Sequence, residues 1–307
     1  MTMKELKIAI LMTCHNRKEK TLQCISALCD ALARYHVSAS DGNIDAKLFL
    51  TDDGCTDGTT EAVARQCSML NAQCSIVKGD GSLYWAGGMR LAWKTALKAE
   101  QSWHYYLLLN DDTLLQPDAF HTLFNAQRYC LDTYGREGIV SGITSAIGDS
   151  STMTYGGEVF VNKFTCRRRL LTPTGKPQLC DWAHANILFV PHQVVQAQGI
   201  LYEGYVHGQA DLDYTYKARQ RGIPVVVTAQ ICGTCNFDHP DVAAISKQLC
   251  AMTLSERRHY LNHPLHSDAD YLLMTRRCMP QKYPLTWLFR KIHLYAPHFY
   301  YWLHKKR

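Results

Sequence analysis

The stretch Tyr105-Tyr106-Leu107-Leu108-Leu109-Asn110-Asp111-Asp112-Thr113 decides the fold. Its five large, mostly apolar residues predict a buried strand, and the polar residues that follow lie at the carboxyl end of this strand. Open α/β sheets bind their ligands at that end. Carboxylates there could hold a divalent cation, because hard cations such as Mg²⁺ take oxygen ligands. The alternative is that Asn110 and Asp112 only cap the next helix, and this stretch alone leaves both interpretations open.

Three strand-and-helix units precede this stretch. Apolar runs predict strands at 7–13, 46–50 and 75–78, each followed by a segment with the apolar spacing of a helix. This alternation predicts an α/β fold with a mostly parallel central sheet flanked by helices. All four strands end in polar or glycine-rich turns, which therefore share one edge of the sheet: Thr13-Cys14-His15-Asn16, Asp52-Asp53-Gly54, Gly79-Asp80-Gly81 and Asn110-Asp111-Asp112.

The second half of the chain is less regular. The patterns predict helices at 114–129 and 212–221, strands at 138–144, 152–161 and 223–228, and a buried apolar run at 182–190. We divide the chain into an α/β domain of residues 1–250 and a C-terminal helical extension of residues 251–307.

Composition places the 307 residues among ordinary globular proteins. The thirteen cysteines are scattered and odd in number, and the apolar run near the N-terminus is too short for a signal peptide. We therefore expect a cytoplasmic protein with free thiols. No stretch approaches the roughly 20 apolar residues that cross a membrane.

Four polar segments together resemble the motifs of a known family, the family 2 glycosyltransferases. This family has the GT-A fold, which binds nucleotide-diphospho-sugars. The resemblance covers residues 6–240; each motif alone is weak, but their order and spacing together are specific. Two further segments, 84–90 and 207–214, resemble a bacterial subgroup that assembles surface polysaccharides. The four motifs are Thr13-Cys14-His15-Asn16-Arg17, Asp52-Asp53-Gly54-Cys55-Thr56-Asp57, Asn110-Asp111-Asp112 and Asp211-Leu212-Asp213.

The resemblance implies a metal site that uses Mg²⁺ or Mn²⁺. Asp112 matches the metal ligand at the end of the family's DxD motif, whose first position here is Asn110. His239 matches a further ligand. A zinc site that uses His239 and the single CxxC of Cys232 and Cys235 is disfavoured, because structural zinc takes four ligands.

The resemblance also implies a nucleotide site. Asp52 and Asp53 match the contacts to the nucleobase and ribose, although a turn closed by their side chains is the alternative. Thr13 lies at the end of the adjacent strand. The complete expected nucleotide-binding set is Thr13, Asn16, Arg17, Asp52, Asp53, Gly81, Gly88 and Asp111.

Transfer of a sugar to a hydroxyl requires a base, and Asp211 matches the family's base. Ala210 stands where many members carry Glu. Asp213 is the alternative base or an acceptor contact, unless it pairs with Lys217 or Arg219. Trp182 and His184 are the other expected acceptor contacts, and Trp182 either stacks on a sugar or fills the core.

Basic residues concentrate near the C-terminus. Residues 271–307 contain eight Lys and Arg, nine aromatic residues and no Asp or Glu, so the rest of the chain is nearly neutral. This combination suits a helix that lies on an anionic membrane. The alternative is packing of the aromatic residues on the body or on a partner subunit. Binding of nucleic acid is a third reading, which the enzyme-like site disfavours.

These observations predict an inverting, metal-dependent glycosyltransferase. It would move a sugar from a nucleotide-diphospho-sugar to a hydroxyl of a glycan or polyprenyl-linked glycan, at the inner face of the cell membrane. Inversion is what the resemblance implies, and a sequence with one well-placed base and no evident nucleophile agrees with it. The alternatives are a binding scaffold without turnover, which Asn110 and Ala210 favour, and a sugar nucleotidyltransferase.

Overall fold

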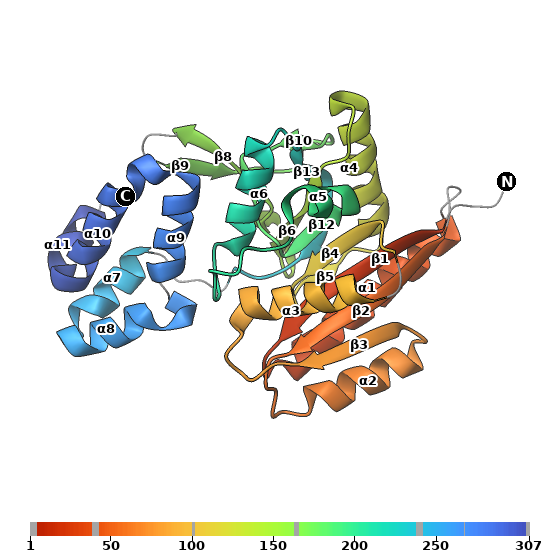
Figure 1. The fold of residues 1–307 in the computed structure, drawn as a ribbon, viewed down its shortest axis with the longest axis horizontal. Helices are drawn as coiled ribbons and strands as arrows, with labels where there is room; N and C mark the ends of the chain where they lie inside the picture. The colour runs from red at the N-terminus through yellow and green to blue at the C-terminus, as the bar shows by residue number, and fades with distance from the viewer. Residues whose placement is uncertain are drawn as a thin grey trace.

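A ten-stranded sheet forms the centre of the computed structural model, which describes residues 5–38, 43–99, 102–162, 166–237, 242–266 and 268–304 (Figure 1). The strand order is β10-β13-β6-β12-β4-β1-β2-β3, with β5 paired to β13 and β7 paired to β6. The strands are β1 (Leu6–Cys14), β2 (Ile44–Asp52), β3 (Gln73–Lys78), β4 (Tyr105–Leu109), β5 (Leu114–Leu115), β6 (Ile139–Ala146), β7 (Asp149–Tyr155), β10 (Gln178–Leu179), β12 (Ile187–Pro191) and β13 (Val225–Thr234).

The predicted parallel arrangement is confirmed in the first half of the chain. Strands β3, β2, β1 and β4 are neighbours in that order and all run parallel. Their polar turns consequently meet at one edge. Strand β12 then pairs antiparallel with β4, so that Ile187 lies opposite Leu109. This register places residues 184–186 beside the turn after β4.

Helices cover both faces of this sheet, because alternate residues of each strand are buried on opposite sides. Ile8 and Ile10 of β1 belong to one buried cluster and Ala9 and Leu11 belong to the other. The first face carries α1 (Lys18–Ser38), α2 (Thr59–Met69) and α4 (Ala119–Tyr134); the second carries α3 (Tyr84–Lys98), α5 (His192–Gln198) and α6 (Ala210–Gln220).

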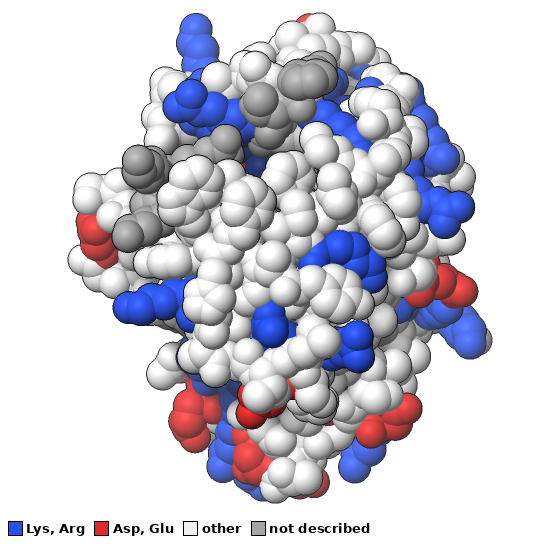
Figure 2. All heavy atoms as spheres, turned by 90° about the vertical axis from the view of Figure 1, so that its left-hand side faces the viewer, with Lys and Arg blue, Asp and Glu red and all other residues white. Residues whose placement is uncertain are grey.

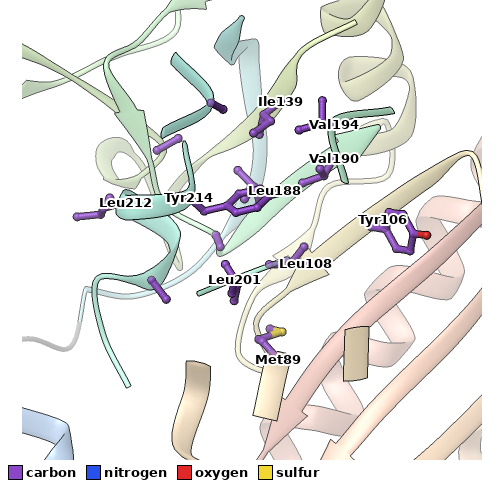
Figure 3. Close-up of a cluster of buried hydrophobic side chains, with 14 of the residues drawn as sticks. Met89, Tyr106, Leu108, Ile139, Leu188, Val190, Val194, Leu201, Leu212 and Tyr214 are labelled. Atoms are coloured by element: carbon purple, nitrogen blue, oxygen red, sulfur yellow. The ribbon is translucent and has the colours of Figure 1, made fainter. Parts of the chain in front are cut away.

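Figure 3 shows the core beneath α6, where Tyr214 lies beside Leu188 of β12 and near Leu108 of β4. Met89 of α3 extends the same cluster. Each fully buried aliphatic side chain of this kind contributes about 1.5–3 kcal/mol relative to an exposed one. The core therefore fixes α3 and α6 against the strands whose ends carry the polar turns.

Several predicted element boundaries differ from the structure. The run 152–161 is divided at Gly156, whose φ of 152° ends β7 before β8 (Gly157–Asn162) begins in a second sheet. The run 182–190 is likewise two strands, β11 (Trp182–Ala183) and β12. The second sheet has the order β11-β8-β9, with β9 at Arg167–Leu170.

The predicted starts of two helices were also wrong. Helix α3 begins at Tyr84, five residues before its predicted start, because Asp53 accepts a hydrogen bond from the Tyr84 N–H. Helix α4 begins at Ala119, because residues 114–115 pair with β13. In both cases a partner distant in sequence decides the boundary.

The C-terminal region is helical, as predicted. Its elements are α7 (Val242–Cys250), α8 (Leu254–Asn262), η1 (Pro264–His266), α9 (Asp268–Cys278), η2 (Pro280–Lys282), α10 (Tyr283–Tyr295) and α11 (Pro297–His304). They gather at one end of the molecule (Figure 1). Met274 and Cys278 of α9 belong to the same buried cluster as α3 and α6. Helix α9 is therefore part of the main core, while α10 and α11 lie further out.

Among the helices in the described ranges, none combines the length and apolar character needed to cross a membrane.

Candidate active site

A cavity of about 470 Å³ lies at the edge where β1, β2 and β4 end. Residues from the polar turns line one side of it, namely Thr13, His15, Arg17, Asp53, Gly81 and Asp111. Tyr84, Trp85, His207, His263 and Leu265 line the rest. Five of the eight expected nucleotide-binding residues, Asp53 and Asp111 among them, are thus brought to one cavity.

Asp53 builds the wall of this cavity. Its Oδ1 accepts hydrogen bonds from the N–H groups of Gly81 (2.9 Å) and Leu83 (3.3 Å), and its Oδ2 accepts one from Tyr84 (2.9 Å). Gly81 has a φ of 85°, which a residue with a side chain adopts only with strain. Asp53 therefore holds the loop before α3 and the first residue of that helix in place.

Asp52 is buried and does not line the cavity. Its Oδ1 accepts the Cys55 N–H at 2.7 Å, and its Oδ2 accepts the Thr60 hydroxyl. Although burial raises its pKa, the hydrogen bonds from Thr60 and Cys55 lower the pKa of Asp52 below its ordinary value. Its carboxylate therefore closes the turn after β2, and its expected nucleotide contact remains a prediction.

Two further expected nucleotide-binding residues shape the edge rather than line the cavity. Asn16 has a φ of 51°, and its Oδ1 accepts the Thr56 N–H at 2.7 Å, which joins the turns after β1 and β2. A Cβ at Gly88 would lie 2.0 Å from the Thr13 Oγ1. Only glycine therefore lets α3 approach the end of β1 this closely.

Arg17 connects the carboxylates of Asp111 and Asp112. Its guanidinium donates to Asp111 Oδ1 at 3.1 Å and also to Asp112. The Thr21 hydroxyl donates to Asp111 Oδ2 at 3.3 Å. Burial raises the pKa of Asp111 to about 6, and Arg17 opposes this shift. One cationic side chain thus balances two acidic groups, of which Asp111 lines the cavity.

Asp211 lies in the first turn of α6, at the same edge. Its Oδ2 accepts the Ala185 N–H at 3.0 Å, and the next residue, Asn186, accepts the Asn110 N–H at 3.1 Å. Burial raises the pKa of Asp211, and His184 opposes this shift. A carboxylate with a raised pKa is a better proton acceptor, and the role of Asp211 as the base stays a prediction.

Comparison with family models decides the class. The model of glycosyl transferase family 2 matches residues 9–181, which is more than half of the chain. The chain belongs to glycosyl transferase family 2. It is a glycosyltransferase that takes its sugar from a nucleotide sugar, and this favours sugar transfer over the two alternatives that the sequence left open. A comparison with curated protein sequences finds no match.

Solved structures agree on the GT-A fold of this glycosyltransferase. The mannosyltransferase PcManGT from Pyrobaculum calidifontis, in complex with GDP-Man and Mn²⁺, is 12% identical over 93% of this chain and 74% of its own, with a TM-score of 0.53. TarS 1–349 from S. aureus is 12% identical over 90% and 73%, with a TM-score of 0.51. GalNAc-T7 with UDP, GalNAc and Mn²⁺ is 12% identical over 75% and 43%, with a TM-score of 0.55.

The oxygen atoms around Asp112 fit a divalent cation that shares its ligands with the donor. Mg²⁺ is usually held by one or two carboxylates together with substrate phosphates. Asp112 is partly exposed beside buried Asp111, which provides such a pair. The Oδ1 of Asn110 accepts the Trp85 indole N–H at 2.7 Å, so its role as a ligand stays a prediction.

The other proposed metal ligand, His239, lies outside the described residues. Within the ranges that the structure describes, no group of three or more His, Cys, Asp or Glu side chains could hold a metal by itself. A cation at Asp112 would therefore depend on oxygen atoms from the donor to complete its shell.

Asp213 has a partner that the sequence did not indicate. The predicted pairing with Lys217 or Arg219 is wrong: Arg277 of α9 donates to both carboxylate oxygens, at 3.0 and 3.1 Å. These residues are separated by 64 positions. Because Asp213 is buried and bound bidentately, it connects α6 to the C-terminal region, and its role as base or acceptor contact gains no support.

Of the other expected acceptor contacts, Trp182 is buried and His184 is half-buried. Trp182 is only 2% exposed, with its ring centre 4.7 Å from that of Phe160 and the Arg168 guanidinium 4.8 Å above it. The Nδ1 of His184 donates to the Gly156 carbonyl at 2.9 Å. The environment of Trp182 therefore fits packing in the core better than stacking on a sugar. An acceptor sugar would reach its ring only if Arg168 moved.

Sequence reasoning did not assign seven residues of the cavity to the site: Cys14, His15, Tyr84, Trp85, His207, His263 and Leu265. Cys14 and His15 belong to the first family motif, and Tyr84, Trp85 and His207 belong to the two subgroup segments. His263 lies beyond every motif, in a stretch with three histidines between 259 and 266, and no local pattern marks it. Only the packing of the C-terminal region against the sheet edge identifies it.

Proposed function

We propose that this glycosyltransferase is inverting and metal-dependent, and that it transfers sugar from a nucleotide-diphospho-sugar to a hydroxyl of a glycan or polyprenyl-linked glycan in surface polysaccharide synthesis. The observation that carries the proposal is the meeting of Asp111, Asp112 and Asp211 at one sheet edge beside the cavity. Asp111 lines the cavity beside Asp112, which would hold the metal, and Asp211 would act as the base.

In this proposal Asp211 accepts the proton of the acceptor hydroxyl while that oxygen forms its bond to the anomeric carbon. The bond from this carbon to the diphosphate breaks in the same step, and the diphosphate leaves from the opposite face of the sugar. The configuration is thereby inverted. The raised pKa of Asp211 supports the role, and the commitment of Asp213 to Arg277 favours Asp211 over its neighbour.

Asp112 and Asp111, with Asn110 and His239 as further predicted ligands, would hold Mg²⁺ or Mn²⁺. When bound, the cation would neutralise the negative charge that develops on the leaving diphosphate. Arg17 would then turn from the carboxylates toward the phosphate oxygens, since both are anionic partners within its reach. The Mn²⁺ in the PcManGT and GalNAc-T7 structures supports the choice of metal.

Calorimetric titration with UDP, dTDP and GDP, each with and without Mn²⁺, tests this proposal. Similar structures that contain GDP-Man or UDP support the first choice of nucleotides. We expect one nucleotide to bind, and to bind only weakly when Mn²⁺ is left out. Equal binding without metal would contradict the metal dependence, and binding of none by the folded protein would contradict the donor site.

We further propose that the outer C-terminal helices place the enzyme on an anionic membrane surface, which would suit a lipid-linked acceptor. Figure 2 shows their face of the molecule: it is largely uncharged, with Lys and Arg within it and Asp and Glu mainly at its margins. The exposed apolar side chains of α10 and α11 include Leu285, Trp287, Leu288, Phe299 and Trp302.

The alternative of packing on the body holds for some of the nine aromatic residues. Tyr300 is buried and stacks on His293, and Tyr271 lies under the Arg290 guanidinium at 4.4 Å. Trp287 and Trp302 are 44% and 62% exposed, and Lys291 lies 5.3 Å from the Trp287 ring centre. An exposed tryptophan beside a lysine is the combination that favours the interface of an anionic bilayer. Lys305, Lys306 and Arg307 lie outside the described residues.

Sedimentation with vesicles that contain anionic phospholipid tests the membrane proposal. We expect the double variant Trp287→Ser and Trp302→Ser to lose most of the binding, and 0.5 M salt to weaken the binding of the wild type. The matched control is Met69→Ser and Leu70→Ser, which removes exposed apolar side chains at the end of α2. Equal binding of both variants would contradict the proposal. Truncation is less informative, because Arg277 binds Asp213 in the core.

A further inference from the structure

Part of the wall of the donor cavity comes from a region that the family model does not reach. The family match ends at residue 181, whereas His263 and Leu265, between α8 and α9, line the cavity together with Asp53 and Asp111. The ring of His263 lies edge-on to Tyr84, with ring centres 6.2 Å apart and an interplanar angle of 88°. The C-terminal region therefore contributes directly to the site.

Tyr84 stands between two histidines. Its ring is edge-on to His207 as well, at 6.2 Å and 79°. Tyr84 has a φ of 51°, a conformation that is strained for a bulky residue and is held here by the bond from its N–H to Asp53. Strained backbone conformations of this kind persist only where surrounding contacts hold them, and they are frequent at functional sites. The strained conformation of Tyr84 places its ring between His207 and His263.

The hydrogen bonds of His263 determine which of its nitrogens can donate. Its Nδ1 accepts the Leu265 N–H at 3.3 Å, so the proton of the neutral ring is on Nε2. His263 is only partly exposed and belongs to the cavity wall. Its Nε2–H is accordingly available as a donor to a ligand in the cavity.

His207 is positioned by the C-terminal region too. The buried carboxylate of Asp270, in α9, accepts three successive backbone N–H groups, from Val206 (3.2 Å), His207 (2.8 Å) and Gly208 (3.0 Å). Asp270 is 4% exposed. Three hydrogen bonds to one buried carboxylate fix the loop that carries His207 and leads into α6.

The groups around this space suit an anion. His207 and His263 line the cavity together with Arg17, whose guanidinium is bonded to Asp111. The carboxylate of Asp53 already accepts backbone N–H groups. The two imidazole rings, beside a guanidinium that already binds carboxylate oxygens, favour the oxygens of a phosphate group. We propose that His263, with His207 beside it, binds the diphosphate of the nucleotide-sugar donor, so that the C-terminal region completes the donor site. This inference rests on the proposed function.

Binding of a matched ligand series tests this assignment. The nucleobase is the one whose diphosphate binds to the wild type. Its nucleoside, nucleoside monophosphate and nucleoside diphosphate are each titrated, with Mn²⁺ present throughout. In His263→Ala we expect the affinity for the diphosphate to fall about ten- to a hundredfold, the range for one hydrogen bond to a charged group, while nucleoside binding is unchanged. His263→Gln, which keeps an N–H donor, should recover part of the loss.

The matched control is His259→Ala, one turn earlier on α8, where the side chain is exposed and does not line the cavity. It should bind all three ligands like the wild type. Unchanged diphosphate affinity in His263→Ala, or an equal loss for nucleoside and diphosphate, would overturn the inference while leaving the proposed function intact. A wild type that binds no nucleoside diphosphate would overturn both.

Discussion

The molecule contains two Asp-Asp pairs that look alike in sequence and act differently in the structure. Asp52-Asp53 follows β2 and Asp111-Asp112 follows β4, and both strands flank β1 and end at the same edge. The first pair accepts hydrogen bonds from backbone N–H groups and from the Thr60 hydroxyl in the first turn of α2. The second pair is balanced by the side chain of Arg17.

This difference supports the proposed division of roles between the two pairs. Backbone partners cannot leave without unfolding a loop, so Asp53 holds the cavity wall, and Asp52 closes the turn after β2. A side-chain partner can turn away, so the proposed function has Asp111 and Asp112 exchange Arg17 for a metal ion and its diphosphate. Position at the sheet edge is shared by both pairs, and the nature of the hydrogen-bond partner separates them.

The largest expected effect extends the comparison to the third acidic group at this edge. Asp211→Asn should lower the rate of sugar transfer about 10²- to 10⁴-fold, the usual contribution of a general base. The affinity for the nucleoside diphosphate should be unchanged, since the proposed function places Asp211 at the acceptor and not at the donor. Turnover and calorimetry on the same preparation measure both quantities. Near-normal turnover in this variant would remove Asp211 from the mechanism.

A substitution in the Asp111-Asp112 pair should have the next largest effect on activity. Asp112→Asn removes one charged metal ligand, and we expect transfer to fall about 10²-fold or more, with weaker Mn²⁺-dependent binding of the donor. Its thermal midpoint should stay close to that of the wild type, because Asp112 is partly exposed and Arg17 keeps its bond to Asp111. A stability loss without a loss of metal dependence would assign Asp112 to the scaffold instead.

The pH dependence of stability should have opposite signs at the two pairs. The pKa of Asp111 is raised from 3.8 to about 6, so between pH 4 and 6 the folded protein binds more protons than the unfolded chain. The free energy of unfolding therefore falls as the pH rises through this window, by at most about 3 kcal/mol from this group. Asp52, whose pKa is lowered, contributes stability that is lost as the pH falls below its ordinary value.

Denaturant unfolding of the wild type, Asp111→Asn and Asp52→Asn at several pH values separates these contributions. Asp111→Asn should make the free energy of unfolding depend less on pH between pH 4 and 6. Asp52→Asn should flatten only the loss of stability at lower pH. Identical pH profiles of the two variants would show that the pairs do not differ in the way their partners indicate.

A substitution in the Asp52-Asp53 pair should have the smallest effect among these predictions. Asp53→Asn replaces one acceptor oxygen by an amide group that faces backbone N–H donors, and we expect a cost of about 1–3 kcal/mol in unfolding free energy. Donor binding should weaken with it, since the loop before α3 loses its anchor. The thermal midpoint and the nucleoside affinity measure the two effects. A variant as stable as the wild type but unable to bind nucleoside would make Asp53 a direct ligand.

The carboxylates show how far sequence reasoning reached. Their presence at one sheet edge follows from strand periodicity and from the order of the motifs, and the structure brings Asp53, Asp111 and Asp211 together there. Their hydrogen-bond partners did not follow, because Arg17 and Arg277 are two of 33 basic residues and no spacing rule selects them. The same limit explains the misplaced start of α3, which depends on Asp53.

The sequence by itself determined the buried strands, their parallel order in the first half and the polar turn at the end of each, because these depend on local periodicity and run length. It also determined the family, through motifs whose order survives any detail of packing. Only the tertiary structure decided which contacts the C-terminal region makes. Arg277 of α9 binds Asp213 of α6, Asp270 of α9 binds the loop before α6, and His263 lines the cavity. Those contacts join residues far apart in the chain, and they depend on how the helices pack against the sheet, which no local pattern encodes.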